Sequence, residues 1–133
     1  MRLNRHQIRE LAFKTLFAMN SNDTISKNDF LKDITNDKLQ TIPDYLNQLI
    51  DGVKAHQSEI DHDISQYLNS GWTIARIART DLIILRIAFY ENNYVDSIPS
   101  KVAINEALEL SKKYSDDKSK NFVNGVLSNI INN

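Results

Sequence analysis

The chain has 133 residues, the usual length of a single domain, and 41% of them are hydrophobic and 25% charged. This composition is typical of a folded globular protein and excludes a disordered chain, while the absence of cysteine excludes disulfides, thiolate metal sites and a cysteine nucleophile. The formal net charge of −1 argues against a protein that binds nucleic acid over its whole surface.

The charges are unevenly distributed along the chain. Residues 1–14 have a local net charge of +3, residues 15–70 of −5 and residues 71–133 of +1. A basic start followed by an acidic middle predicts a confined contact with an anionic partner.

The sequence contains no targeting or membrane-spanning segment that we can identify. The first nine residues are charged and lack the apolar stretch of a signal peptide. The longest apolar segment, at residues 82–90, is about half the ~20 residues that a membrane span needs. We therefore expect a cytoplasmic protein.

Apolar residues recur at helical spacing throughout the chain, which contains only three glycines and two prolines. This pattern predicts an all-α fold with short connections. In the first half we predict a helix over residues 5–19, a short helix that starts at Ser26, and a long helix from Pro43 to about Leu68.

The segment Asn69-Ser70-Gly71 is the predicted boundary between an N-terminal half (1–70) and a C-terminal half (71–133) of one domain. A short helix over 74–78 follows. The next helix, over 82–93 with Asp81 as its cap, is apolar on nearly every side and is the predicted central helix. Pro99 precedes a further helix, and Ser115 is the predicted cap of the last one.

A row of basic and aromatic residues lies along the first helix. At 100° per residue, and if helical order extends back to Arg2, four residues share an arc of about 100°: Arg2, Arg5, His6 and Arg9. Phe13 and Phe17 continue the row. Arginines that meet phosphates beside an aromatic ring that stacks on an unpaired base suit single-stranded RNA. The alternative is that the arginines are merely solvated and both rings pack internally, as we expect more strongly for Phe13.

The sequence gives little support for a metal site, an enzyme active site or a DNA-binding helix. His56, Glu59 and Asp63 share a helical face, but surface helices often carry such residues, and no further histidine stands at a supporting spacing. There is no glycine-rich phosphate loop and no nucleophile motif. A helix-turn-helix DNA reader needs polar side chains on its recognition helix, and residues 82–93 are too apolar. We expect a protein that is not an enzyme and that has no metal or cofactor.

Three segments resemble the motifs of the NusB family, in the family's order and spacing. They are Leu-Arg-Ile-Ala-Phe-Tyr-Glu at 85–91, Ile-Pro-Ser-Lys-Val-Ala-Ile-Asn-Glu-Ala at 98–107 and Phe-Val-Asn-Gly-Val-Leu at 122–127. The first half is similar more loosely, at 9–12, 16–17, 52–53, 60–61 and 64. The resemblance therefore covers essentially the whole chain and is strongest from Trp72 onward.

The resemblance implies a seven-helix fold of two packed three-helix subdomains plus a connecting helix. It also implies binding to the boxA element of ribosomal RNA transcripts together with NusE, a small-subunit ribosomal protein. That pair joins NusA, NusG and RNA polymerase to suppress premature termination. The family's RNA-contacting residues correspond to Arg5, Arg9 and Phe17, and its acidic residue facing the ribosomal protein corresponds to Asp81.

The chain also departs from the family pattern. His6 and Gln7 stand where arginines are frequent, and Lys118 stands where some relatives have an acid. We therefore expect weak RNA binding by the protein alone, with Lys118 as an added phosphate contact. Polar motif residues such as Arg86, Tyr90, Asn105 and Asn124 are expected to fix the fold by hydrogen bonds between helices.

Two alternatives to a free-standing antitermination factor remain. A NusB-like domain also occurs fused to ribosomal RNA methyltransferases, which would require a downstream domain with a cofactor loop and a catalytic cysteine; the sequence to Asn133 has neither. The other alternative is a partner-binding module with little affinity for RNA. It remains open because the row contains few basic residues to contact phosphates.

Overall fold

The computed structural model describes residues 2–130 of the chain. Its helices are α1 (Arg5–Ser21), α2 (Lys27–Ile34), α3 (Asp44–Ala55), α4 (Gln57–Ser65), the 3-10 helix η1 (Ile74–Arg76), α5 (Arg79–Tyr94), α6 (Ser100–Tyr114) and α7 (Asp117–Leu127). No strand occurs in residues 2–130, so the all-α prediction is confirmed.

Side-chain caps in the sequence set the start of several helices. Asn4 and Gln7 form a reciprocal capping box at the start of α1, and Ser26 caps α2 as predicted. The predicted cap of the last helix is wrong by one residue. Asp116 caps α7, accepting a hydrogen bond from the Ser119 amide at 2.9 Å, while Ser115 ends α6.

The long helix predicted from Pro43 to Leu68 is two helices. The chain leaves helical geometry at His56, where φ is −106° and ψ 16°, and α4 ends at Ser65. The apolar residues before and after the break, Val53 and Ile60, are seven residues apart. That spacing also fits one continuous helix, so the apolar pattern does not reveal the bend. The His56 ring stacks on the Tyr94 ring at a centroid distance of 4.2 Å, which ties the break to the end of α5.

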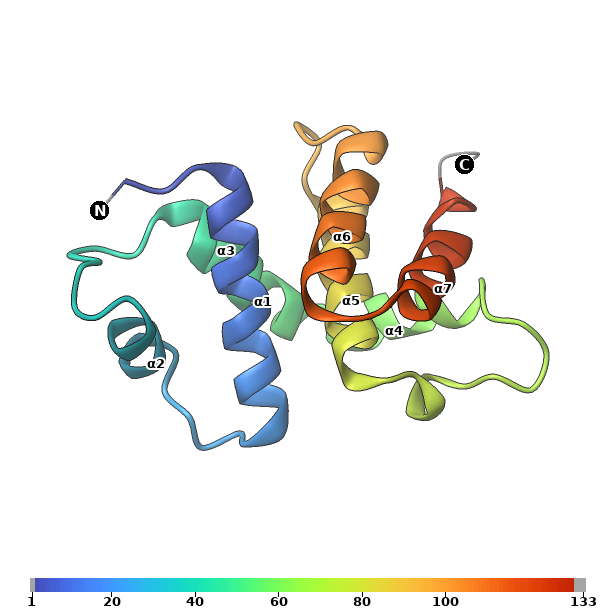
Figure 1. Ribbon diagram of the computed structural model, residues 1–133, viewed down its shortest axis with the longest axis horizontal. Helices are drawn as coiled ribbons and strands as arrows, with labels where there is room; N and C mark the ends of the chain where they lie inside the picture. The colour runs from blue at the N-terminus through green and yellow to red at the C-terminus, as the bar shows by residue number, and fades with distance from the viewer. Residues whose placement is uncertain (1, 131–133) are drawn as a thin grey trace.

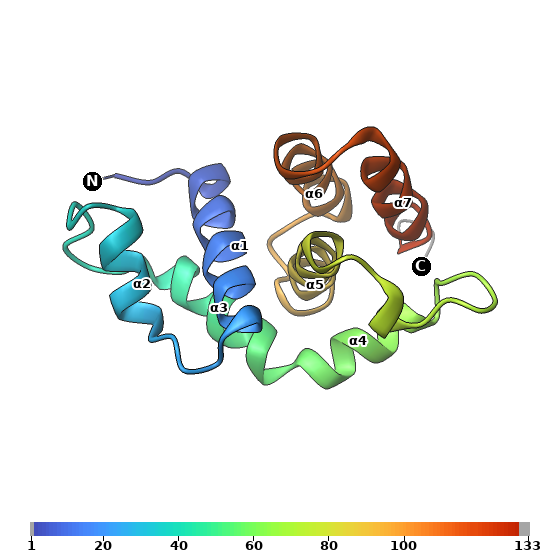
Figure 2. The ribbon, with the colours of Figure 1, turned by 60° about the horizontal axis from the view of Figure 1, so that its bottom comes forward.

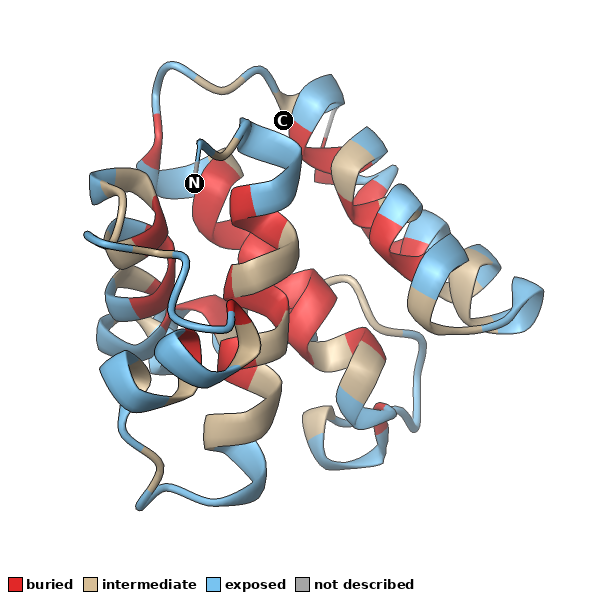
Figure 3. Cartoon of the chain, turned by 60° about the vertical axis from the view of Figure 1, so that its left-hand side comes forward, coloured by how far each residue is buried: buried red, intermediate tan, exposed pale blue. Residues whose placement is uncertain are grey.

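Helix α5 is the central helix, as its apolar sequence predicted. It contacts α1, α3, α4, α6 and α7, and ten of its sixteen residues are buried. Figure 2 shows it between the α1–α3 group and the pair α6 and α7. In Figure 3 the buried residues lie on the inward faces of the helices and along most of this central one.

The helices form two groups of three, which confirms the predicted seven-helix fold. Figure 1 shows α1, α2 and α3 on one side and α5, α6 and α7 on the other, with α4 running from the end of α3 behind the second group. The chain turns from α4 into the second group through Gly71, whose φ of +87° is readily adopted only by glycine. Within the described residues, none of these helices has the length and apolar character needed to cross a membrane.

Candidate nucleic-acid interface

The start of α1 presents positive charge to solvent. Arg2, Arg5 and His6 are all exposed, the first just before the helix and the others in its first turn. The Arg5 guanidinium carbon lies 3.6 Å from the centre of the Tyr45 ring of α3, a cation–π contact that orients the side chain without neutralising it. Among the described residues, no carboxylate lies within 4.0 Å of Arg2 or Arg5. Both side chains are therefore available to an anion.

His6 is partly committed to the protein itself. Its Nδ1 lies 2.8 Å from Glu106 Oε2 on α6, although 48% of the His6 side chain remains exposed. A phosphate would have to compete with this carboxylate for the imidazole. The structure thus makes His6 a weaker anion contact than the two arginines.

Arg9 does not lie on the exposed row, contrary to our expectation. The residue is 3% exposed, and its Nε donates to both carboxylate oxygens of Glu91 at 3.0 and 2.9 Å. Its Nη1 lies 3.6 Å from Glu106 Oε1. The helical angle placed Arg9 correctly beside His6, since both side chains approach Glu106, but the neighbouring α5 and α6 cover that end of the arc. Arg9 is an internal ion-pair partner.

The Arg9–Glu91 pair is completed from a third helix. The Tyr45 hydroxyl of α3 donates a hydrogen bond to Glu91 Oε2. Burial, the hydrogen bond with Glu91 and the Glu91 charge raise the pKa of Tyr45 above its usual range. Tyr45 therefore stays a neutral donor, and the same ring supports Arg5 on its outer face. The Tyr45 hydroxyl thus contacts the buried Arg9–Glu91 ion pair, while the Tyr45 ring contacts the exposed Arg5 guanidinium.

The two aromatic rings at the end of the row differ in exposure, as predicted. Phe13 is 4% exposed and belongs to the core, whereas Phe17 is only partly buried, with its ring centre 6.0 Å from that of Phe13. The Arg79 guanidinium carbon lies 5.8 Å from the Phe17 ring centre. Phe17 thus keeps an accessible ring beside a cation.

Asp81 and Lys118 lie elsewhere, on the far side of α5 and α6 from α1. Both line a hollow of about 250 Å³ that also includes Trp72, Arg76 and Phe122. Lys118 is exposed in the first turn of α7. Figure 1 shows α7 well separated from α1, so the structure does not bring Lys118 into the basic row.

The predicted role of Asp81 as a helix cap is wrong. Ala78 occupies the cap position of α5, and Asp81 lies in the first turn with 5% of its surface exposed. Its Oδ1 has no hydrogen-bond partner among the described residues. Burial raises the pKa of Asp81 and the Asp116 charge adds to this, while the Ser119 side chain acts in the opposite direction. A buried carboxyl cannot offer an exposed charge to a protein partner.

The polar motif residues have mixed placements. Arg86 is buried and forms a two-point ion pair with Asp61 of α4, at 2.9 Å for each contact, and Tyr90 is buried against α3. Arg86 therefore confirms the expected hydrogen bonds between helices, whereas Tyr90 is shown to contribute by packing. Asn105 and Asn124 are exposed, contrary to the expectation that they bond across helices.

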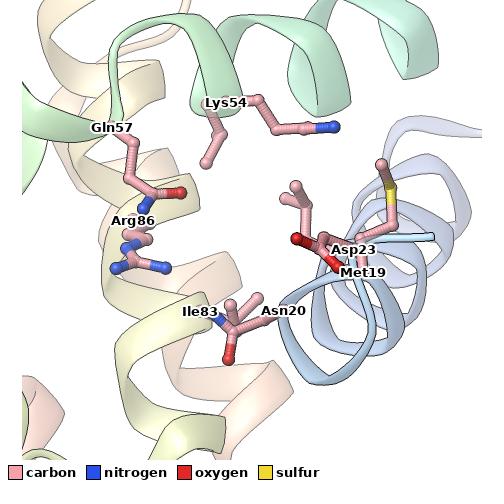
Figure 4. A pocket seen from close by; sticks show the side chains of 9 residues that line it. Met19, Asn20, Asp23, Lys54, Gln57, Ile83 and Arg86 are labelled. Carbon is pink, nitrogen blue, oxygen red and sulfur yellow. The ribbon is translucent and has the colours of Figure 1, made fainter. Parts of the chain in front are cut away.

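Figure 4 shows a pocket of about 240 Å³ beside Arg86. Lys54 and Asp23 stand at its edges with opposite charges, and Asn20, Gln57, Met19 and Ile83 are among the other lining residues that the figure labels. Because Arg86 is already neutralised by Asp61, the lining has no excess charge to select a ligand. In the part of the chain that is described, no three histidine or carboxylate side chains are grouped as metal ligands.

Sequence reasoning missed three residues around the row: Tyr45, Arg79 and Tyr114. Tyr45 and Tyr114 lie on other helices, and no spacing relates them to α1. Arg79 was overlooked because the helix was predicted to begin after Asp81, which left Arg79 in a loop. The actual start of α5 at Arg79 gives this side chain a fixed position.

Comparison with known proteins assigns these features to a family. Residues 6–132 match the model of the NusB family. The transcription antitermination protein NusB of Levilactobacillus brevis is 52% identical over 134 residues, covering 98% of this chain and 94% of that protein. The protein of the same name from Ligilactobacillus salivarius is 51% identical, covering 98% of this chain and all of that protein.

Solved structures agree with the fold. NusB of T. maritima superimposes with a TM-score of 0.84 at 32% identity, covering 99% of this chain and 93% of that one. A chain from a crystal structure of the antitermination factors NusB and NusE in complex with double-stranded RNA gives a TM-score of 0.80 at 28% identity, with 96% of both chains covered.

Proposed function

The chain belongs to the NusB family, and from this membership we propose that it is a transcription antitermination factor that binds boxA RNA of ribosomal RNA transcripts together with NusE. The relatives that share about half of its residues bear the name of antitermination proteins. A structural neighbour was crystallised with NusE and RNA. The role is one of binding and not of catalysis. We further propose that the RNA complex joins NusA, NusG and RNA polymerase.

The observation that carries the proposal is the exposed start of α1. Arg2 and Arg5 are free of carboxylate partners among the described residues, and Phe17 offers a ring further along the same helix. Phosphates attract such side chains without regard to sequence, and an exposed ring accepts an unpaired base. With His6 held by Glu106 and Arg9 buried, few contacts remain, so we expect weak binding without NusE.

The direct test is a gel shift with single-stranded boxA-like RNA, with and without NusE. About three phosphate contacts predict a log–log slope of affinity against salt of roughly −2. A duplex competitor of the same sequence is included, because the related complex contains double-stranded RNA. Absence of a shift even with NusE would contradict the proposal.

A double variant, Arg2→Glu with Arg5→Glu, tests the assigned face. Two repulsive charges in place of two attractive ones should lower affinity at least tenfold. Lys54→Glu is the matched control, since Lys54 is exposed and lines the pocket of Figure 4 away from the row. Arg9 stays unchanged because it is buried. Equal affinity of the double variant and the control would show that the face is wrongly assigned.

For NusE we propose the hollow beside Asp81. Trp72 is 45% exposed there, with the Arg76 guanidinium 5.2 Å from its ring centre, and exposed tryptophan and arginine are frequent anchors of protein interfaces. Asp81 lines the same hollow but is buried, so we expect no direct contact between its carboxylate and NusE. Trp72→Ala should weaken the NusE complex at least tenfold in calorimetric titration, and an unchanged dissociation constant would rule the hollow out.

A module that binds NusE with little affinity for RNA is the second candidate. The burial of Arg9 favours it, because this removes one of the four basic residues that the sequence placed in the row. Under this alternative NusE binds normally, while RNA affinity is unaffected by the Arg2 and Arg5 substitutions.

A further inference from the structure

We propose that a hollow between α1, α2, α5 and α6 seats one unpaired base of the bound RNA, and that Arg79 at its edge contacts the neighbouring phosphate. This inference rests on the proposed RNA-binding function and deepens it by defining a base site and one additional contact. Phe13 and Phe17 belong to the row that the sequence predicted, whereas Arg79, Tyr114 and the hollow beside them do not.

The hollow has the lining that a base requires. Its volume is about 330 Å³, and it is lined by Phe13, Lys14, Phe17, Ala18, Phe30, Thr80 and Tyr114. The Phe13 ring centre lies 4.9 Å from that of Tyr114 and 6.0 Å from that of Phe17. The three rings form an aromatic wall from α1 to α6 in which Phe17 and Tyr114 are partly exposed and the Phe13 ring between them is buried. Bases of any sequence stack on such a wall, because every base has a π face.

The electrostatics of the hollow favour an anionic polymer. No carboxylate lines it, and Lys14 is part of its wall. The nearby Glu10 accepts two contacts of 2.9 Å from Lys113 and lies 3.8 Å from Lys14, so its charge is matched. Burial and the Glu10 charge raise the pKa of Tyr114 to about 12, which keeps its ring neutral. The site therefore repels neither a base nor its phosphates.

Arg79 is fixed where a phosphate of that nucleotide would pass. It is exposed, it is the first residue of α5, and its Nη1 donates to Ser21 Oγ at the end of α1 at 3.0 Å. Its guanidinium carbon lies 5.8 Å from the Phe17 ring centre. No carboxylate among the described residues lies within 4.0 Å of it. The positive end of the α5 helix dipole adds to its attraction for phosphate.

The distance along α1 fits a single strand that reaches both sites. Arg5 and Phe17 are separated by twelve helical residues, which corresponds to about 18 Å. At about 3.4 Å per stacked nucleotide, this distance spans on the order of five nucleotides. One RNA strand can thus contact Arg2 and Arg5 at one end of α1 and place a base beside Phe17 at the other.

The charge pattern decides between RNA and a protein side chain as the occupant. An apolar side chain of a partner would gain nothing from Lys14 and Arg79, two cations at the edge of the hollow. A nucleotide uses both its ring and its phosphate there. RNA therefore accounts for the rings and for the cations together.

The test is a fluorescence scan with single-stranded boxA-like RNAs in which 2-aminopurine replaces one nucleotide at a time, measured with the full chain and NusE. Stacking on the aromatic wall should quench one position much more strongly than its neighbours. Ala18→Leu fills the hollow without changing charge, and it should abolish this quenching and lower affinity several-fold. Far-UV circular dichroism confirms that the variant is folded.

Arg79→Glu tests the phosphate contact. We expect about tenfold weaker binding and a salt slope that is smaller by about 0.7, the value for one phosphate contact to a single strand. Lys54→Glu is again the charge control. If Arg79→Glu and Ala18→Leu both bind RNA as the wild type does, the inference fails while the proposed function stands. If the wild type binds no RNA, the proposed function itself fails.

A third result would assign the hollow to a protein. If both variants keep the RNA affinity that the wild type has without NusE and lose binding to NusE, the occupant is a side chain of NusE. That result overturns the base site. Position-specific quenching that disappears in Ala18→Leu supports it.

Discussion

Arg9 and Asp81 are both charged side chains of the kind that sequence analysis assigns to a surface, and both are buried in the fold. They differ in their partners. Arg9 faces the Glu91 carboxylate at hydrogen-bond distance, whereas one Asp81 oxygen has no partner among the described residues. This difference predicts opposite effects on stability when each charge is removed.

Arg9→Met should destabilise the protein by about 3–5 kcal/mol, because it leaves the Glu91 charge buried without a counter-ion. The measurement is the free energy of unfolding in urea. Changing Glu91 to leucine in the same chain should restore much of the loss, since an apolar pair often replaces a buried ion pair at little cost. Arg2→Met, at an exposed position, is the control and should change stability by less than about 0.5 kcal/mol. If Arg9→Met is as stable as the control Arg2→Met, the Arg9–Glu91 ion pair does not stabilise the fold.

Asp81→Asn should raise the thermal midpoint at neutral pH. A carboxyl whose pKa is raised in the folded state opposes folding while it is ionised, and this cost disappears as the pH falls toward its unfolded value of 3.8. The advantage of the asparagine variant should therefore shrink between neutral pH and about pH 4. Asp96→Asn, in an exposed turn, should show no such trend. A variant less stable than the wild type at neutral pH would refute the assignment.

At the scale of elements, helix α3 meets α5 at a glycine. A Cβ on Gly52 would lie 2.3 Å from the Tyr90 ring, a distance that no real contact tolerates. In contrast, nothing lies within 4 Å of a Cβ on Gly125 in α7. A side chain at position 52 would collide with the Tyr90 ring, whereas no neighbouring atom excludes a side chain at position 125.

Gly52→Ala should cost about 1–3 kcal/mol in unfolding free energy, because the packed Tyr90 must move. Gly125→Ala should instead stabilise by up to about 1 kcal/mol through helix propensity alone. Urea unfolding of the two variants side by side gives the comparison. The same sign of change in both would mean that the Tyr90 contact does not control the α3–α5 distance.

The elements also show what sequence can predict. Helix existence followed from apolar spacing, and caps such as Ser26 followed from local hydrogen bonding. The break at His56 did not, because Val53 and Ile60 keep helical spacing across it and the ring contact with Tyr94 comes from a distant part of the chain. The candidate site followed the same rule. Spacing found Arg5 and Phe17 on one helix, but α1 begins at Arg5 and leaves Arg2 before it, and the burial of Arg9 depends on α5 and α6.

At the scale of the whole molecule, α5 contacts α1 and α3 as well as α6 and α7 of its own group, and the buried apolar residues of both groups form one hydrophobic cluster. We predict that the chain unfolds in a single transition in spite of its two three-helix groups. The only tryptophan, Trp72, reports on the second group through its contact with Phe122, and far-UV circular dichroism reports on all helices. The two urea curves should coincide. Separate midpoints would show that residues 1–70 and 71–133 are independent units.

The internal position of Arg9 also affects how mutational data on this protein are interpreted. A survey that neutralises each basic residue of α1 and scores RNA retention alone would rank Arg9 among the strongest contacts, although a side chain with 3% exposure cannot touch a ligand. Its loss would reduce the fraction of molecules that are folded, and binding would decline in proportion. Only a paired readout, the affinity per folded molecule, separates the residues that hold RNA from the arginine that holds the helix.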